Sequence, residues 1–102
     1  MSDPTSEVVD DAVHHRFVYA ETGDAAHLVY QDEAGRLILV HTEVPEALGG
    51  RGIAGRLVQA AVERARERGA TLVPWCPYAR HWLKGHPDAA SGVTIDWSGP
   101  VA

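Results

Sequence analysis

The sequence predicts an α+β domain in which a mixed, mostly antiparallel sheet is flanked by two helices. Three runs of strand-forming residues, separated by turn residues, fill the first half of the chain. A longer run with helical periodicity and then a short apolar run follow, which is the order of a crossover between parallel strands. Because the chain has only 102 residues, we expect one domain.

The composition is typical of a folded globular chain. Hydrophobic residues make up 45% of the sequence, which argues against disorder. The net charge of -5 argues against non-specific binding to nucleic acid, which needs a basic face. One cysteine allows no intramolecular disulfide, and no signal peptide or membrane-spanning run is apparent. We therefore expect a cytoplasmic protein with no nucleic-acid or membrane partner.

The strands of the first half follow an acidic N-terminal segment. We expect residues 1–13 to form a flexible arm before a single domain at 14–102, although Val8-Val9 could pair with a strand. The strands are expected at 16–20, 26–31 and 36–41, with turns at 21–24 and 32–35. Leu37 to Val40 is apolar without alternation, which is typical of a strand covered on both faces. The third strand should therefore be central in an antiparallel meander.

The second half is predicted to be mainly helical. A helix is expected from Gly52 or Ile53 to Arg68, because apolar residues recur there at the spacing of one helix face. These residues are Ala54, Leu57, Val58, Ala61, Val62 and Ala65. Gly69 should end this helix. The remaining expected elements are a helical turn at 45–48, a parallel strand at 70–73, a helix at 77–85 and an edge strand at 93–97.

The stretch from Leu48 to Val58 carries the most specific functional signal. Its glycines lie between a strand and a helix, where they permit positive φ and close approach of a ligand. The first turn of a helix also offers unpaired N–H groups and a partial positive charge. Together these features predict an anion site, most often a phosphate site.

Two known glycine-rich phosphate motifs fit this stretch poorly. The nucleotide-triphosphatase loop GxxxxGK(S/T) needs a Lys-Ser or Lys-Thr pair, and the chain has none. Residues 50–55 match the dinucleotide fingerprint GxGxxG. That fingerprint also needs a tight strand-to-helix turn and an acidic residue about 20 positions on. Here residues 42–49 separate the strand from the glycines, and residues 71–76 contain no acid.

Residues 49–54, followed by Leu57-Val58, resemble the acyl-CoA loop of the GNAT acetyltransferase superfamily, usually written Q/R-x-x-G-x-G/A. Gly52 and Ala54 match the last two defined positions. Gly49 stands where Gln or Arg is usual, and Arg51 could supply the missing cation. The segments 41–45, 73–78 and 86–87 also resemble short, single-domain GNAT-like proteins, so that the resemblance runs from Phe17 to Asp88.

This resemblance implies a GNAT-like fold trimmed at the N-terminus. The implied activity is acetyl-CoA-dependent N-acetylation of an amine, either a small molecule or a protein. The residues implied to bind acyl-CoA are Val44, Leu48, Gly49, Gly50, Arg51, Gly52, Ile53 and Ala54. Two alternatives stay open, a non-catalytic acyl-CoA binding or sensing module and a plain interaction domain. The first of these is serious because the chain lacks the N-terminal helices that usually build the acceptor side. In a homodimer, the second copy of the chain could supply the acceptor side of the site.

Two residues at the end of the third strand are candidates for the catalytic base. Acyl transfer to an amine needs a group that removes a proton from the amine. Glu43 and His41 should share one face of the strand, with Thr42 on the opposite face. The alternatives are a solvated strand end or an Arg51 partner for Glu43, and a hydrogen-bonded, half-buried histidine for His41.

Two further candidates follow the fourth strand. Cys76 would lie at a helix N-terminus, where a thiol can become a nucleophile, although single cysteines are usually small buried hydrophobes. Tyr78 resembles the tyrosine that many superfamily members use as general acid, and its alternative is aromatic packing.

Metal binding is not expected, because the six histidines form no HExxH and no paired CxxC occurs. Arg80 and Lys84 could meet the 3′-phosphate of CoA, but an ordinary solvated face is the simpler interpretation.

Overall fold

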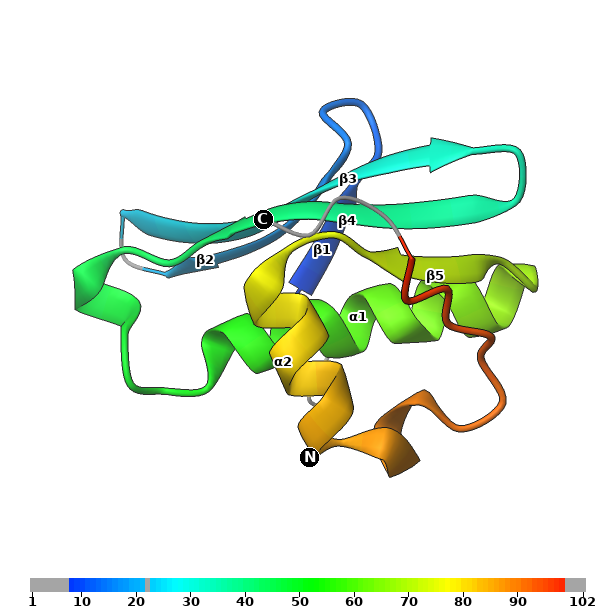
Figure 1. Ribbon diagram of the computed structural model, residues 1–102. Helices are drawn as coiled ribbons and strands as arrows, with labels where there is room; N and C mark the ends of the chain where they lie inside the picture. Colours follow the sequence, from blue (N-terminus) through cyan, green and yellow to red (C-terminus); the bar gives the residue numbers. More distant parts are fainter. Residues whose placement is uncertain (1–7, 22, 99–102) are drawn as a thin grey trace.

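Within the described residues, 8–21 and 23–98, five strands form one sheet, and both longer helices lie on the same face of it (Figure 1). The order is β1-β2-β3-β4-β5, antiparallel up to β4 and parallel between β4 and β5. In this computed structural model the strands are β1 (Val8–Asp11), β2 (Arg16–Glu21), β3 (Asp24–Glu33), β4 (Arg36–Glu43) and β5 (Thr71–Pro74). The helices are η1 (Glu46–Leu48), α1 (Ile53–Arg68), α2 (Pro77–Gly85) and η2 (Pro87–Ala90).

The predicted α+β class, the meander and the parallel fourth strand are therefore confirmed. Helix α1 begins and ends where the periodicity predicted, and Gly69 ends it with a φ of 63°. Helix α2 matches the predicted 77–85. The strand at 36–41, predicted to be central, is an interior strand between β3 and the edge strand β5, and its Leu37, Ile38 and Leu39 are all buried.

Strand β1 occupies part of the segment that we predicted to be a flexible arm. It pairs antiparallel with β2, so Val8-Val9 does find a partner. The guanidinium of Arg64, a buried residue of α1, lies 3.0 Å from the Asp10 carboxylate, and the Tyr30 hydroxyl donates a hydrogen bond to Asp10 at 2.5 Å. A buried arginine needs carboxylate partners, so this acidic residue fastens the strand to the helix. Residues 1–7 lie outside the described residues, and the domain boundary at 14 stays a prediction.

The C-terminal segment 93–97, which we predicted to be an edge strand, makes only an isolated bridge. Ile95 pairs parallel with Leu72. The Leu72 N–H donates to the Thr94 carbonyl and the Asp96 N–H donates to the Leu72 carbonyl, both at 2.9 Å. Beyond the bridge, Trp97 packs against basic side chains of α2. The prediction of a full strand here is wrong.

A β-bulge in β4 sets which side chains face the helices. Tyr30 of β3 is opposite Leu39, whereas Val29 is opposite His41, so that Val40 has no partner on β3. Before the bulge, Leu39 belongs to the core beneath the helices. After it, Thr42 lies opposite the core residue Leu28 and faces the helices. The pairing with β5 stops just before the bulge, since Leu39 pairs with Pro74, the last residue of β5.

Helices α1 and α2 approach closely at Gly55. A Cβ built on this glycine would lie 2.6 Å from Trp82 Nε1. The Trp82 ring cannot swing away freely, because it stacks on His86 with ring centroids 4.2 Å apart. The third glycine of the GxGxxG match thus serves helix packing, which positions α2 beside the N-terminus of α1.

Gly55→Ala should therefore destabilise the protein. Alanine gains about 1 kcal/mol of helix propensity, but overpacking of this kind costs about 1–3 kcal/mol. We expect a net loss near 1 kcal/mol, which lowers the Tm by roughly 4–8 °C in a domain of this size. Gly85→Ala is the matched control, since its added Cβ meets nothing within 4 Å. Equal melting temperatures for the two variants would contradict the close packing.

Candidate functional site

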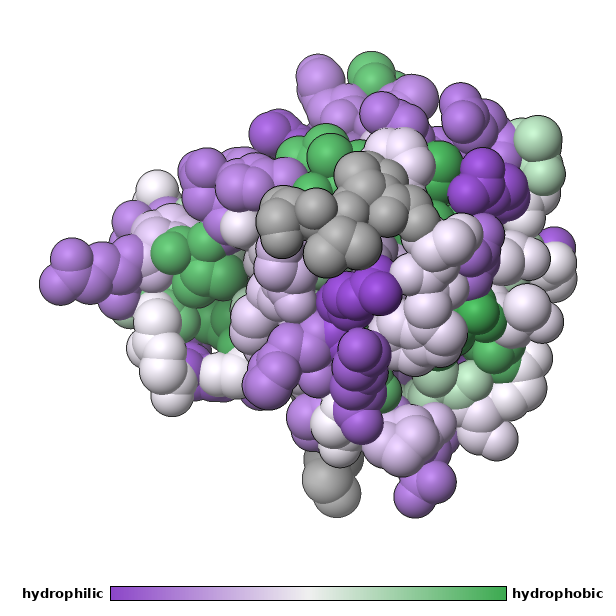
Figure 2. Space-filling view, in the orientation of Figure 1, coloured by the Kyte–Doolittle hydropathy of each residue, from purple (hydrophilic) through white to green (hydrophobic). Residues whose placement is uncertain are grey.

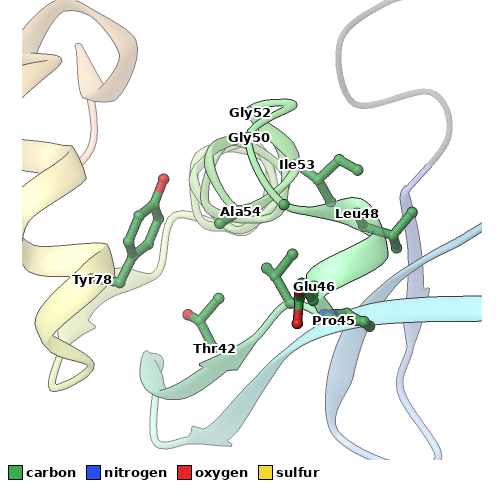
Figure 3. Close-up of a pocket in the computed structure, with 11 residues that line it drawn as sticks. Thr42, Pro45, Glu46, Leu48, Gly50, Gly52, Ile53, Ala54 and Tyr78 are labelled. Carbon is green, nitrogen blue, oxygen red and sulfur yellow. The ribbon is translucent and has the colours of Figure 1, made fainter.

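A pocket of about 550 Å³ opens on the helix face of the sheet, between the end of β4, the loop before α1 and the start of α2. Hydrophobic residues reach the surface at several places in this view, and one of these places is around the segment that leads into α1 (Figure 2). The lining residues are Thr42, Val44, Pro45, Glu46, Leu48, Gly49, Gly50, Gly52, Ile53, Ala54 and Tyr78 (Figure 3). Every residue that the sequence implied for acyl-CoA binding lines this pocket except Arg51.

The glycine loop, residues 49–52, needs glycine for its backbone conformation. Gly50 and Gly52 have φ of 75° and 72°, in the left-handed region that costs other residues about 1–2 kcal/mol. Gly49 has ordinary extended backbone, but a Cβ there would lie 3.2 Å from the carbonyl oxygen of Glu46 in η1. A side chain at this position would therefore require the Glu46 carbonyl to shift by a few tenths of an ångström.

The N-terminus of α1 opens on the same pocket. Gly52 is its N-cap and no side chain caps the helix, and its first turn contains no acidic residue. The Arg56 N–H donates to the Gly52 carbonyl, so the helical hydrogen-bond ladder begins there. The N–H groups of the preceding turn, which includes the lining residues Ile53 and Ala54, have no acceptor within the helix. Free N–H groups at the positive end of a helix dipole bind anions.

The side chain of Arg51 turns away from the pocket and binds Glu21 at the end of β2. Its guanidinium donates hydrogen bonds of 2.7 and 2.9 Å to the two carboxylate oxygens, and the Tyr19 hydroxyl donates another at 2.5 Å. These donors lower the pKa of Glu21 to about 2, Arg51 having the larger effect. For Arg51 to serve as a phosphate ligand, it would have to leave Glu21. Arg51 therefore pairs with Glu21 and not with Glu43, which we had considered as an alternative partner.

The two candidate bases lie on the helix-free face of the sheet. His41 and Glu43 share this face, as the strand alternation predicted, with His41 Nε2 3.6 Å from a Glu43 carboxylate oxygen. His27 of β3 contributes a third group, 3.8 Å from the other oxygen of Glu43. Glu43 and His41 are 64% and 61% exposed, so both are open to an incoming molecule. The bulge at Val40 is what sends them to the face opposite the pocket.

Thr42 of β4 and Tyr78 of α2 bring polar groups to the pocket. Tyr78 and Thr42 line the pocket, and Thr42 Oγ1 lies 3.2 Å from the Sγ of Cys76 (Figure 3). Cys76 is buried at the N-terminus of α2 and is not a lining residue. Burial, together with the nearby Cys76, raises the pKa of Tyr78, which keeps its phenol protonated. Sequence reasoning missed Thr42, because no residue pattern announces the bulge that turns it inward.

Comparison with known proteins assigns this arrangement to a family. A model of the GCN5-related N-acetyl-transferase family matches residues 16–92, which includes β4, the glycine loop and both longer helices. The chain belongs to this family. Protein NATD1 of Gallus gallus is 34% identical over 84 residues, which cover 79% of this chain and 76% of that protein. Protein NATD1 of Mus musculus is 38% identical over 65 residues, covering 63% and 59%.

A solved structure shows the same fold. The solution structure of a GCN5-like protein from Staphylococcus aureus superposes with a TM-score of 0.67 and covers 94% of this chain and 93% of its own. Because the sequence identity is 24%, this similarity supports the fold assignment alone. The GCN5-related N-acetyltransferase fold is thus shown by the sequence family and by the architecture.

Within this family member, the basic residues of α2 are held away from the pocket. The guanidinium of Arg80 lies 5.7 Å and the ammonium of Lys84 5.5 Å from the centre of the Trp97 ring. Neither residue lines the pocket, which favours the solvated-face interpretation over contact with a 3′-phosphate.

Across residues 8–21 and 23–98, no group of three or more His, Cys, Asp and Glu side chains could hold a metal ion. In the same part of the chain, no helix has the length and apolar character needed to span a membrane.

Proposed function

We propose that this protein transfers the acetyl group of acetyl-CoA to an amine. The observation that carries the proposal is the uncapped N-terminus of α1, which opens with the glycine loop on a pocket beside the point where β4 leaves β5. An anion site and an apolar pocket next to a gap in a sheet suit a long ligand with a phosphate group and a thioester. Membership in the GCN5-related N-acetyltransferase family supports the same ligand.

Backbone N–H groups supply the proposed phosphate binding. The pyrophosphate would accept hydrogen bonds from the glycine loop and the first turn of α1, where no acidic side chain repels it. Val44 and Leu48 would contact the apolar part of the ligand, and its thioester end would lie toward Thr42 and Tyr78. Because the backbone carries the binding, changes of loop side chains should matter less than changes of loop conformation or charge.

The two faces of the sheet divide the chemistry. The amine would arrive on the helix-free face, where Glu43 accepts its proton and His41 lies beside Glu43. Backbone N–H groups of β4 beyond Leu39, which have no partner on β5, are the donors available to the developing oxyanion. Tyr78 is protonated at neutral pH, as any tyrosine is, and would donate a proton to the leaving thiolate. One proton thus leaves the amine and one reaches the sulfur.

Direct transfer requires less rearrangement than a route through Cys76. For an acyl-enzyme, the buried thiol would have to leave its contact with Thr42 and reach the thioester in the pocket. Attack by the amine requires no movement of this kind. We therefore propose Glu43 as base and Tyr78 as acid, with Thr42 in the pocket wall beside the thioester and Cys76 packed behind Thr42.

A second candidate function is a non-catalytic acyl-CoA binding or sensing module. The observation that favours it is that α1 and α2 cover the same face, so that among residues 8–21 and 23–98 no helix covers the face of Glu43 (Figure 1). Few residues would enclose a bound acceptor on that face unless a second copy of the chain supplied them. Binding without turnover is the outcome that distinguishes this candidate from the enzyme.

Gly52→Asp should abolish most acetyl-CoA binding, and Gly52→Asn should not. Asn and Asp have similar size and tolerate left-handed φ better than most residues, and a Cβ at Gly52 meets nothing within 4 Å. Only Asp places a negative charge beside the proposed pyrophosphate. By titration calorimetry we expect Gly52→Asp to bind at least about tenfold more weakly than Gly52→Asn, with a gap that narrows in high salt. Equal affinities would show that the phosphates lie elsewhere.

Glu43→Gln should lower the rate of acetyl transfer by about 100-fold or more, because a general base contributes on that order. Tyr78→Phe should lower kcat less, since solvent can protonate a thiolate. The measurement is CoA release over a panel of amines, with Glu33→Gln as a control for the loss of one exposed charge on the sheet. A Glu43→Gln rate equal to that of the wild type would remove Glu43 as the base. Tight acetyl-CoA binding with no release for any amine would favour the binding module.

A further inference from the structure

The glycine loop has a single side chain with which to fix its conformation. Of residues 49–52 only Arg51 is not glycine, and the glycines on either side of it both have left-handed φ. Glycine loses more conformational freedom on ordering than any other residue. Unless something holds this loop, a phosphate ligand must order it at the moment of binding, which weakens the affinity.

Arg51 connects the loop to the rigid part of the sheet. Both of its terminal nitrogens donate to Glu21, at 2.7 and 2.9 Å, which is the two-pronged geometry that suits an arginine–carboxylate pair. Glu21 is the last residue of β2, and its carboxylate also accepts a hydrogen bond from the Tyr19 hydroxyl at 2.5 Å. Tyr19 is a core residue, only 3% exposed, so the position of its ring is fixed by packing.

A second basic side chain adds to the contact between loop, helix and strand. Arg56, in the first turns of α1, has its guanidinium 5.9 Å from the centre of the Tyr19 ring. Arg51 and then Tyr19 lower the pKa of Glu21 to about 2, so that its carboxylate stays ionised even in mildly acidic solution. The Glu21 carboxylate is therefore a permanent negative partner for the loop.

We infer that Glu21, Tyr19 and Arg51 form a brace that holds the glycine loop ready to bind phosphate, so that Glu21 and Arg51 are positioning residues of the acyl-CoA site. This inference rests on the proposed function. Arg51 acts through the loop backbone and not as a phosphate ligand, since its side chain does not line the pocket and both its prongs are engaged. An exposed ion pair adds little to global stability, so the brace acts locally on the loop.

The opposite arrangement would make Glu21 an inhibitor of binding. If Arg51 were a phosphate ligand, Glu21 would compete with the phosphates for it, and its removal would strengthen acetyl-CoA binding. The brace predicts weaker binding on the same change. The two accounts therefore differ in the sign of one measured effect.

Glu21→Gln tests this sign by titration calorimetry with acetyl-CoA. We expect the Kd to rise about three- to tenfold, the usual cost of ordering a few groups on binding. Tyr19→Phe, which keeps the buried ring, should raise it by less. The double variant Glu21→Gln with Arg51→Gln should bind no more weakly than the weaker single variant, because the pair acts as one unit.

Glu63→Gln is the matched control. Glu63 also forms an exposed ion pair with an arginine, Arg66, but on α1 and not on the loop. This control removes the same negative charge at a distance from the loop. If Glu63→Gln leaves the Kd for acetyl-CoA unchanged, the effect of Glu21→Gln comes from the loss of the brace and not from the loss of one charge that repels an anionic ligand. In turnover, Glu21→Gln should raise the KM for acetyl-CoA and leave kcat unchanged. Tighter or unchanged binding by Glu21→Gln would overturn the inference.

A measurement without ligand separates this inference from the proposed function. Backbone ¹⁵N order parameters of residues 49–52 should be near those of the strands in the wild type and should fall below about 0.6 in Glu21→Gln. If the wild type bound no acetyl-CoA, the proposed function would be wrong. The comparison of loop order parameters would still show whether Glu21 holds the loop. Loop order parameters equal in the two proteins would overturn the brace.

Discussion

One unpaired residue in β4, Val40, decides which side chains at the end of the strand face the helices and the pocket. Strand alternation alone would place His41 and Glu43 on the face of Leu37 and Leu39, beneath the helices. The bulge at Val40 reverses the alternation, so that Thr42 turns toward the helices and the acidic end of the strand turns away from them. Just before the bulge the pairing of β4 with β5 also ends, at Leu39 and Pro74, beside the pocket. The geometry of the candidate site depends on this irregularity.

The glycine loop places the helix N-terminus at that gap. Two left-handed glycines turn the chain from η1 into α1 without a capping side chain, so the first N–H groups of the helix stay available. Gly55 lets α2 approach, and α2 supplies Tyr78 to the same pocket. The three glycines of the GxGxxG match therefore have different physical tasks, two in backbone conformation and one in helix packing. A dinucleotide site is not needed to explain them.

The elements of the fold were readable from the sequence where the signal is local. Periodicity placed α1, proline and apolar runs placed α2 and β5, and the loop resemblance pointed to the family. Contacts between distant residues were not readable. Arg64 of α1 pairs with Asp10 of β1. The acidic segment that was predicted to be a flexible arm therefore contains a strand of the sheet. The direction of Arg51 depends on Glu21, 30 residues earlier, and that of Thr42 depends on a bulge with no sequence marker.

The central claim is that backbone N–H groups of the glycine loop and of the first turn of α1 bind the phosphates of acyl-CoA. Titration of ¹⁵N-labelled protein with acetyl-CoA, followed by amide NMR spectra, tests it most directly. The account predicts that the largest shifts fall on residues 49–55, with NAD at the same concentration producing none of them. Large shifts elsewhere with this segment unchanged, or no saturable shift at all, would contradict it.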